Sequence, residues 1–280
     1  MNFFIKFLII ISLVVFQSCS KDEKEISTIK EIDQESEMIT TYKEGLQNIN
    51  EGDYFYAAKK FLESELLFPQ SDWAPRSALM ASYSYYIDSY YDEAIFNLER
   101  FIKTYPNDKR MSYAYYLLGM CHYETIANEK KDLAPLTKAK KIFTGIVNDY
   151  PNTDFAMDSK FKIGLIDDIL ASKEMYIGRH YIKKEKWVAA INRFKIVLVD
   201  YDTTIYAEEA VHRLVEIHYK IGLEEEAKKY ANLLGYNYLS SEWYKRSYKI
   251  FNTKYQIKKN IIEKNRKDKS GLIQKFKKIF

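Results

Sequence analysis

A short pattern of small and aromatic residues recurs five times along this 280-residue chain. Each copy has an alanine at the same point of a helix-like segment, and the first four copies have a large apolar residue four positions later. The alanines are Ala57, Ala94, Ala139, Ala190 and Ala227, at separations of 37, 45, 51 and 37 residues. A period of this length is typical of chains in which one structural unit stacks on the next. The repeat therefore constrains the fold more than any other feature.

The repeat predicts a pair of helices in each copy. A small residue lies twelve positions before the alanine in three copies, as Gly45, Ser82 and Gly178. In the third copy the matching Gly119 lies eight residues further back, which a polar insertion at residues 128–132 explains. Pro69, Pro106 and Pro151 come after the second helix of the first three copies. Proline cannot continue a helix, so these residues mark helix ends. The fifth copy has Val215 at the small site and lacks the proline, as expected of a terminal unit.

Composition and periodicity favour an all-α fold. The 9 glycines and 5 prolines are too few for the turns of a many-stranded β protein. No segment alternates strictly between polar and apolar residues, whereas Ile191, Phe194 and Val197 follow helical spacing. The chain resembles the tetratricopeptide repeat, a pair of antiparallel helices of about 34 residues. We therefore expect a right-handed all-α solenoid of about five helix pairs over residues 36–250, with no sheet.

The N-terminal residues resemble a lipoprotein signal. Residues 7–16 are apolar except for one serine, a run shorter than the roughly 20 residues of a membrane span but suited to a secretory signal. Gln17 and Ser18 lead to Cys19, as in the lipobox of bacterial lipoproteins, where the thiol receives diacylglycerol and the amine is acylated. We predict a signal peptide at 1–18, and a lipidated Cys19 with a flexible tether at 19–35. The alternative is an ordinary signal peptide with an incidental cysteine.

Residues 251–280 form a basic tail. From residue 253 onward the chain has ten lysine and arginine residues and two acidic residues, which gives this segment a net charge of +8. The rest of the chain therefore has a net charge of −4. The stripe Leu272, Ile273, Phe276, Ile279 and Phe280 predicts an amphipathic helix for an anionic membrane surface or an acidic groove. A solvated tail is the alternative.

Tyrosines gather on the first helix of the first three copies. In repeats of this kind the first helix lines the concave face. Its groove-facing positions hold Tyr42, Leu46, Ile49, Leu79, Tyr83, Tyr86, Tyr113, Tyr116, Met120 and Tyr123. Tyrosine offers large contact area and a hydroxyl, which suits binding of an extended peptide. Alternatively, these side chains pack against neighbouring helices.

Signals of enzyme chemistry are absent from the sequence. It has no phosphate-binding glycine loop, zinc-protease motif or serine-hydrolase elbow. His122 and His218 occupy the position that holds Tyr85 and Tyr181 in two other copies, which predicts packing roles. His212 and His218 are six residues apart and face different sides of a helix. We expect no cofactor, no metal site and, given the acidic body and export signal, no nucleic-acid binding.

Three further strings resemble the BamD (YfiO) family, lipoproteins of the outer-membrane β-barrel assembly (BAM) machine. They are residues 100–106, residues 187–194 and residues 241–244, and the resemblance spans about 36–250. It implies a non-enzymatic scaffold in the inner leaflet of the outer membrane, facing the periplasm. Its implied partners are BamA, other BAM lipoproteins and unfolded barrel proteins. The expected BamA contacts are Arg179, Trp187, Asn192 and Arg193.

Two alternatives stay open on the sequence alone. One is a pilus or secretin pilot lipoprotein, which would share the repeats and bind a different client. The other is a glycan-binding outer-membrane lipoprotein, which also uses helical repeats and aromatic platforms.

Overall fold

The computed structural model describes residues 23–125, 132–239 and 241–252. The predicted signal peptide, Cys19 and the tail from residue 253 lie outside the described residues. Within the described ranges every regular element is an α-helix, so the predicted all-α class is confirmed there. The chain divides into two units, residues 1–125 and 126–280, and each is described by itself.

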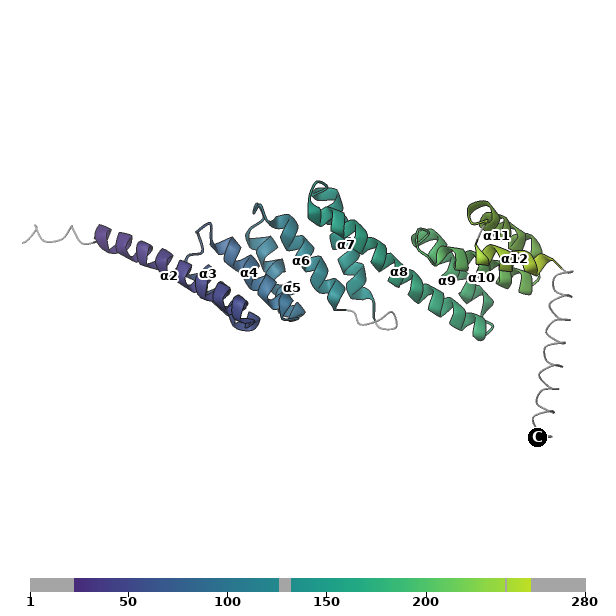
Figure 1. Ribbon diagram of the computed structural model, residues 1–280, viewed down its shortest axis with the longest axis horizontal. Helices are drawn as coiled ribbons and strands as arrows, with labels where there is room; N and C mark the ends of the chain where they lie inside the picture. Colours follow the sequence, from purple (N-terminus) through teal and green to yellow (C-terminus); the bar gives the residue numbers. More distant parts are fainter. Residues whose placement is uncertain (1–22, 126–131, 240, 253–280) are drawn as a thin grey trace, which may run out of the picture. The chain divides into compact units, whose positions relative to one another are not determined.

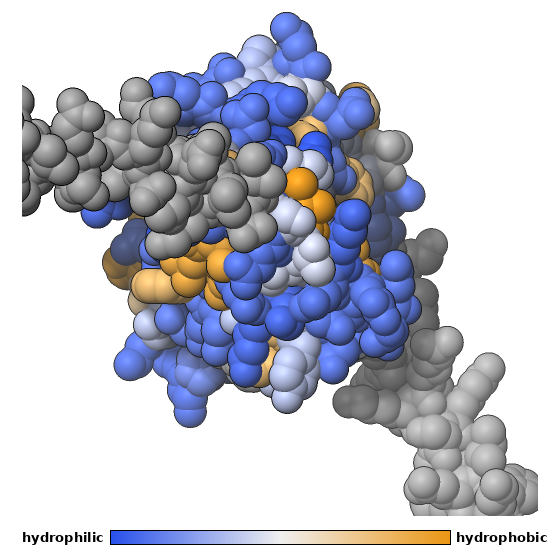
Figure 2. Space-filling view, turned by 90° about the vertical axis from the view of Figure 1, so that its left-hand side faces the viewer, coloured by the Kyte–Doolittle hydropathy of each residue, from blue (hydrophilic) through white to orange (hydrophobic). Residues whose placement is uncertain are grey.

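Unit 1 is a row of helices in which each packs on the next (Figure 1). The helices are α2 (Glu23–Glu51), α3 (Tyr54–Leu67), α4 (Ala74–Ile87), α5 (Tyr91–Thr104) and α6 (Met111–Glu124). The surface seen from the α2 end is mainly hydrophilic, with smaller apolar patches (Figure 2). Inside the unit, the Glu65 carboxylate accepts hydrogen bonds of 2.7 and 2.6 Å from Arg100 and one of 2.8 Å from the Tyr105 hydroxyl. This ion pair joins α3 to α5.

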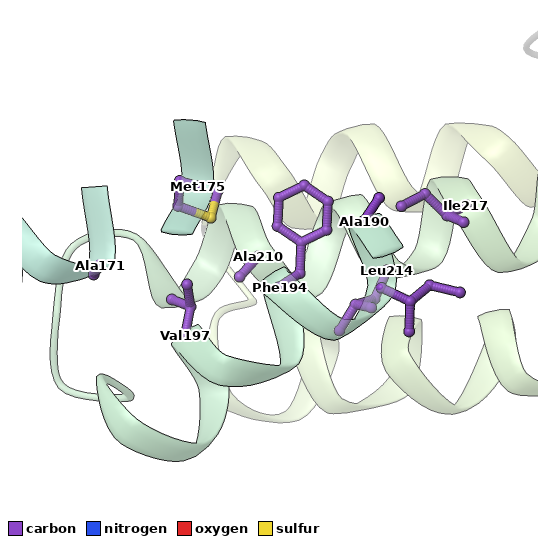
Figure 3. Packing of buried hydrophobic residues seen from close by; sticks show 9 residues of the cluster. Ala171, Met175, Ala190, Phe194, Val197, Ala210, Leu214 and Ile217 are labelled. Atoms are coloured by element: carbon purple, nitrogen blue, oxygen red, sulfur yellow. The ribbon is translucent and has the colours of Figure 1, made fainter. Parts of the chain in front are cut away.

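Unit 2 contains the remaining helices. They are α7 (Ala134–Asp149), α8 (Asp154–Lys183), α9 (Trp187–Asp200), α10 (Ala207–Lys220), α11 (Glu224–Asn237) and α12 (Glu242–Phe251). Its core gathers side chains from α8, α9 and α10 around Phe194, which is fully buried (Figure 3). Met175 contributes from α8 and Leu214 from α10. The helix that follows the last repeat, α12, packs on both α10 and α11.

The repeat positions predicted to touch are buried. All five repeat alanines have no exposed surface, and neither do Phe61, Leu98, Phe143 and Phe194, which follow four residues later. A Cβ atom added at Gly45 would lie 2.8 Å from the Phe61 ring, and one at Gly178 would lie 2.6 Å from the Phe194 ring. Because real Cβ atoms do not approach this closely, glycine lets the two helices of these pairs meet.

The turns inside four of the predicted pairs share one backbone conformation. Gly52, Ser89, Glu185 and Gly222 have φ angles of +83°, +62°, +56° and +85°. Each lies two residues before the second helix of its pair. In each turn the next residue donates its N–H to a carbonyl five residues back, as Lys186 does to Tyr181 at 3.0 Å. This left-handed cap reverses the chain and satisfies carbonyls at the helix end.

The first described helix starts before the predicted beginning of the solenoid at residue 36. Helix α2 begins at Glu23, inside the segment 19–35 predicted to be a flexible tether. Residues 23–35 contain no glycine or proline and are rich in glutamate, lysine and isoleucine, so nothing in their sequence stops the helix. The insertion predicted at 128–132 falls between the end of α6 at Glu124 and the start of α7 at Ala134. These two helices, assigned to the third pair, belong to different units.

Candidate functional site

Three tyrosines cluster where α4 contacts α6 in unit 1. Tyr83, Tyr86 and Tyr113 are half-buried, and the rings of Tyr86 and Tyr91 are 6.0 Å apart. Burial raises the pKa of Tyr86 to about 12, and the nearby Glu124 carboxylate adds to the shift. Burial also raises the pKa of Tyr113, with Tyr83 and Tyr86 close enough to contribute. The phenols of Tyr86 and Tyr113 therefore keep their protons at neutral pH.

Three of the residues predicted to line a groove are in the core instead. Tyr42, Leu79 and Met120 expose only 8%, 4% and 8% of their surface. The Tyr42 ring packs edge-on against Phe61 at 5.1 Å and Trp73 at 5.2 Å. The prediction that these three side chains line a groove is wrong, because the positions face the neighbouring helices.

The other predicted positions keep some exposure. Leu46 on α2 is 38% exposed, and Tyr116 and Tyr123 on α6 are half-buried. Burial raises the pKa of Tyr123, and Glu124 adds to the shift. The predicted tyrosines that keep some exposure lie on α4 and α6, and the name tyrosine cluster is used below for Tyr83, Tyr86, Tyr113, Tyr116 and Tyr123.

Among the predicted docking residues of unit 2, the two arginines form ion pairs with different glutamates. Arg179 on α8 pairs with Glu209 on α10 at 2.9 Å. Arg193 on α9 pairs with Glu174 on α8 at 3.0 Å. One pair therefore joins α8 to α10 and the other joins α8 to α9. Both pairs are partly exposed, so each arginine can exchange its partner at moderate cost.

Trp187 and Asn192 differ in their surroundings. Trp187 packs against the core cluster around Phe194, and the Lys220 ammonium lies 4.5 Å from the centre of its ring. The tryptophan therefore helps to hold α9 against α10. The Asn192 side chain is exposed on α9. Of the four predicted residues, Asn192 is the most accessible to a partner.

The sequence did not predict the polar network that joins α10 to α12. The buried His212 lies 2.8 Å through Nδ1 from the Ser247 hydroxyl and 3.3 Å through Nε2 from Glu216. Although burial raises the pKa of Glu216, the bonds from His212 and Arg213 lower it to about 2. The i, i+4 spacing of His212 and Glu216 was the only sequence signal.

Trp243 packs against the polar network of His212, Ser247 and Glu216. Its ring lies 5.1 Å from the His212 ring, with the guanidinium groups of Arg213 and Arg246 at 5.6 and 4.7 Å. His218 is also buried and packs against Tyr230 at 5.2 Å, as its aromatic position predicts. Cys121 is fully buried, and burial raises its pKa to about 12.

The described residues do not meet the requirements of a metal site or of a membrane-spanning helix. No group of three or more histidine, cysteine, aspartate or glutamate side chains is arranged to hold a metal ion there. None of the described helices combines the length and apolar content that crossing a bilayer requires.

Comparison with known proteins identifies the family. Residues 34–233 match the model of the YfiO family, described as an outer membrane lipoprotein. The chain belongs to the YfiO family. It is 40% identical over 211 residues to the outer membrane protein assembly factor BamD of Caulobacter vibrioides, covering 75% of this chain and 69% of that one. BamD of Rickettsia prowazekii is 39% identical, covering 76% of this chain and 85% of that one. BamD of Neisseria meningitidis serogroup A is 28% identical, covering 84% and 92%.

The YfiO match ends inside α11. It begins within α2 and leaves α12 and the tail beyond its limits. The tyrosine cluster and the predicted docking residues all fall within the matched range. Both sets of residues therefore belong to the part of the chain that the family shares. Helix α12 and the tail lie outside that part.

Proposed function

We propose that this chain is an outer membrane protein assembly factor that works as a non-enzymatic scaffold. The observation that carries this proposal is the YfiO match over residues 34–233, together with relatives at 40% and 39% identity that are named assembly factors. A lipid on Cys19 would hold the scaffold in the inner leaflet of the outer membrane, on the periplasmic side. Two acyl chains or more make such an anchor effectively permanent, since each buried CH₂ contributes about 0.8 kcal/mol.

The tyrosine cluster is the proposed binding site for unfolded barrel proteins. Barrel strands alternate polar and apolar residues and expose main-chain groups until they pair. Half-buried tyrosines suit such a strand, because their rings provide apolar contact and a hydroxyl group can bond main-chain carbonyls. The cluster lies on the first helices of two successive pairs, α4 and α6, which contact each other directly.

A synthetic peptide from the C-terminal strand of a barrel protein tests this site. Substituting Tyr83→Ala together with Tyr116→Ala should weaken binding of the peptide at least tenfold, a loss of about 1.4 kcal/mol. Binding is measured by fluorescence anisotropy, and circular dichroism checks that the helices remain. Tyr56→Ala is the matched control, because Tyr56 is 58% exposed and outside the cluster. Unaltered affinity in the double variant would remove the cluster from the account.

Unit 2 is the proposed docking site for the barrel insertase BamA, and other BAM lipoproteins are further expected partners. Asn192 is exposed, and Arg193 pairs with Glu174 at the partly exposed surface of α9. An acidic group of the partner could therefore replace Glu174 and form a new ion pair with Arg193. The variant Arg193→Ala should reduce recovery of BamA from membranes, whereas Lys195→Ala, an exposed control on the same helix, should not. Equal recovery with both variants would assign docking to other residues.

A further inference from the structure

The turn between α10 and α11 presents an apolar surface at the last repeat. Tyr219, Ile221 and Leu223 expose 37%, 37% and 50% of their surface there. Gly222 lies among them with no side chain to cover the surface. The equivalent turns of the first and fourth pairs, residues 50–53 and 183–186, contain only polar residues and one glycine. The turn of the second pair also exposes apolar side chains, Ile87 at 39% and Tyr90 at 44%, so the last repeat shares this character with one other turn.

Helix α12 brings the following part of the chain to this surface. Its last residue, Phe251, packs edge-on against Tyr219, with the ring centres 5.5 Å apart. Tyr255 comes four residues later, and four residues of extended chain span at most about 14 Å. A connection this short holds the segment at high effective concentration next to the turn.

Charge indicates what covers the turn. Glu224, Glu225 and Glu226 begin α11 directly after Leu223. Residues 253–264 combine four lysines and one glutamate with apolar side chains, the latter being Tyr255, Ile257, Ile261 and Ile262. This composition complements an apolar surface followed by three glutamates, of which Glu225 and Glu226 also pair with lysines of α11. The same glutamates disfavour an anionic lipid surface at this turn.

We propose that residues 253–264 of this chain bind the turn formed by Tyr219, Ile221 and Leu223. Tyr255, Ile257 and Ile261 supply the apolar contacts. Three of the four lysines of the segment, Lys254, Lys258 and Lys259, face the glutamates at the start of α11. This contact covers the end of the last repeat and lies beyond the range that the YfiO family model matches. It does not depend on the proposed function.

Zero-length carbodiimide cross-linking of the full chain in detergent, mapped by mass spectrometry, tests the contact. The expected products join Lys254, Lys258 or Lys259 to glutamates 224–226 within one molecule. The bonds of Lys228 to Glu225 at 2.7 Å and of Lys229 to Glu226 at 2.6 Å give an internal reference. Hydrogen exchange of residues 219–223 is the second measurement, because a covered turn exchanges more slowly than an open one.

Matched variants separate this contact from other effects of the tail. Ile257→Asp in the segment, or Ile221→Asp in the exposed turn, should lower the cross-link yield and speed exchange of the turn about tenfold. Ile273→Asp, in the same tail but outside the segment, should change neither. Absence of the cross-links in the unaltered chain overturns the proposal. Cross-links formed only between molecules also overturn it, because they assign the turn to a second copy of the chain. Slow hydrogen exchange of the turn that requires anionic vesicles overturns it too, because it assigns the turn to lipid.

Discussion

Two non-glycine residues, Ser89 and Glu185, adopt the left-handed backbone at positions where two other repeats have glycine. A side chain in this conformation costs roughly 1–2 kcal/mol, from steric contact between Cβ and the backbone. The remaining geometry of the turn compensates, since the capping hydrogen bonds form as they do around Gly52 and Gly222. Ser89 and Glu185 are therefore places where a single substitution should stabilise the chain.

Replacing Glu185→Gly should raise the free energy of unfolding by about 0.5–1 kcal/mol, because relief of the strain exceeds the added entropy of the unfolded chain. Thermal or urea unfolding followed by circular dichroism measures the change. The neighbouring Lys184 has an ordinary φ of −96°, so Lys184→Gly is the matched control and should destabilise. Destabilisation by both substitutions would show that the left-handed conformation at residue 185 carries no strain.

Glu216 makes the stability of unit 2 depend on pH. Its pKa falls from 4.5 to about 2 in the folded chain, because the bonds from His212 and Arg213 outweigh the effect of burial. A carboxyl with a lowered folded pKa stabilises the fold above its unfolded pKa, and this stabilisation is lost as the pH falls through its folded pKa. Between pH 5 and pH 2, the urea midpoint should fall more steeply for the unaltered chain than for Glu216→Gln. Equal slopes would contradict the assignment.

At the scale of the helix pair, glycine sets how closely two helices meet. Gly178→Ala should destabilise unit 2 by about 2 kcal/mol, because the new methyl group would overlap the fully buried Phe194 ring. Gly164 lies on the same helix, α8, with nothing within 4 Å of an added Cβ. Gly164→Ala should therefore stabilise by about 0.5–1 kcal/mol through helix propensity alone. Denaturant unfolding of the two variants measures both effects, and a loss of stability in Gly164→Ala would contradict the distinction.

The sequence predicted the contacts of the repeat well, because they depend on short-range spacing. Ala57 and Phe61 are four residues apart on one helix, and Gly45 is opposite them on the other, so all three positions follow from the pattern. The length of α8 could not be predicted in this way. Its 30 residues continue one helical pattern through the place where a shorter repeat would begin, and no glycine-proline boundary marks the extra turns.

The candidate sites were predicted less well, because exposure depends on neighbours that are distant in the sequence. Tyr42 and Tyr83 fit the same pattern, yet Tyr42 is packed between Phe61 and Trp73 while Tyr83 is half-buried. The hydrogen bond between His212 and Ser247 links residues 35 apart in the sequence, and no local spacing predicts such a contact.

For the complete protein, we propose that this YfiO family member holds other proteins together at a membrane. Purification of the lipidated chain from native outer membranes, with mass spectrometry of its partners, tests that claim most directly. We expect BamA and barrel proteins to be recovered, and the processed N-terminus to carry acyl chains on Cys19. Recovery of a secretin in place of BamA, or of a soluble, unmodified chain without partners, would contradict the account.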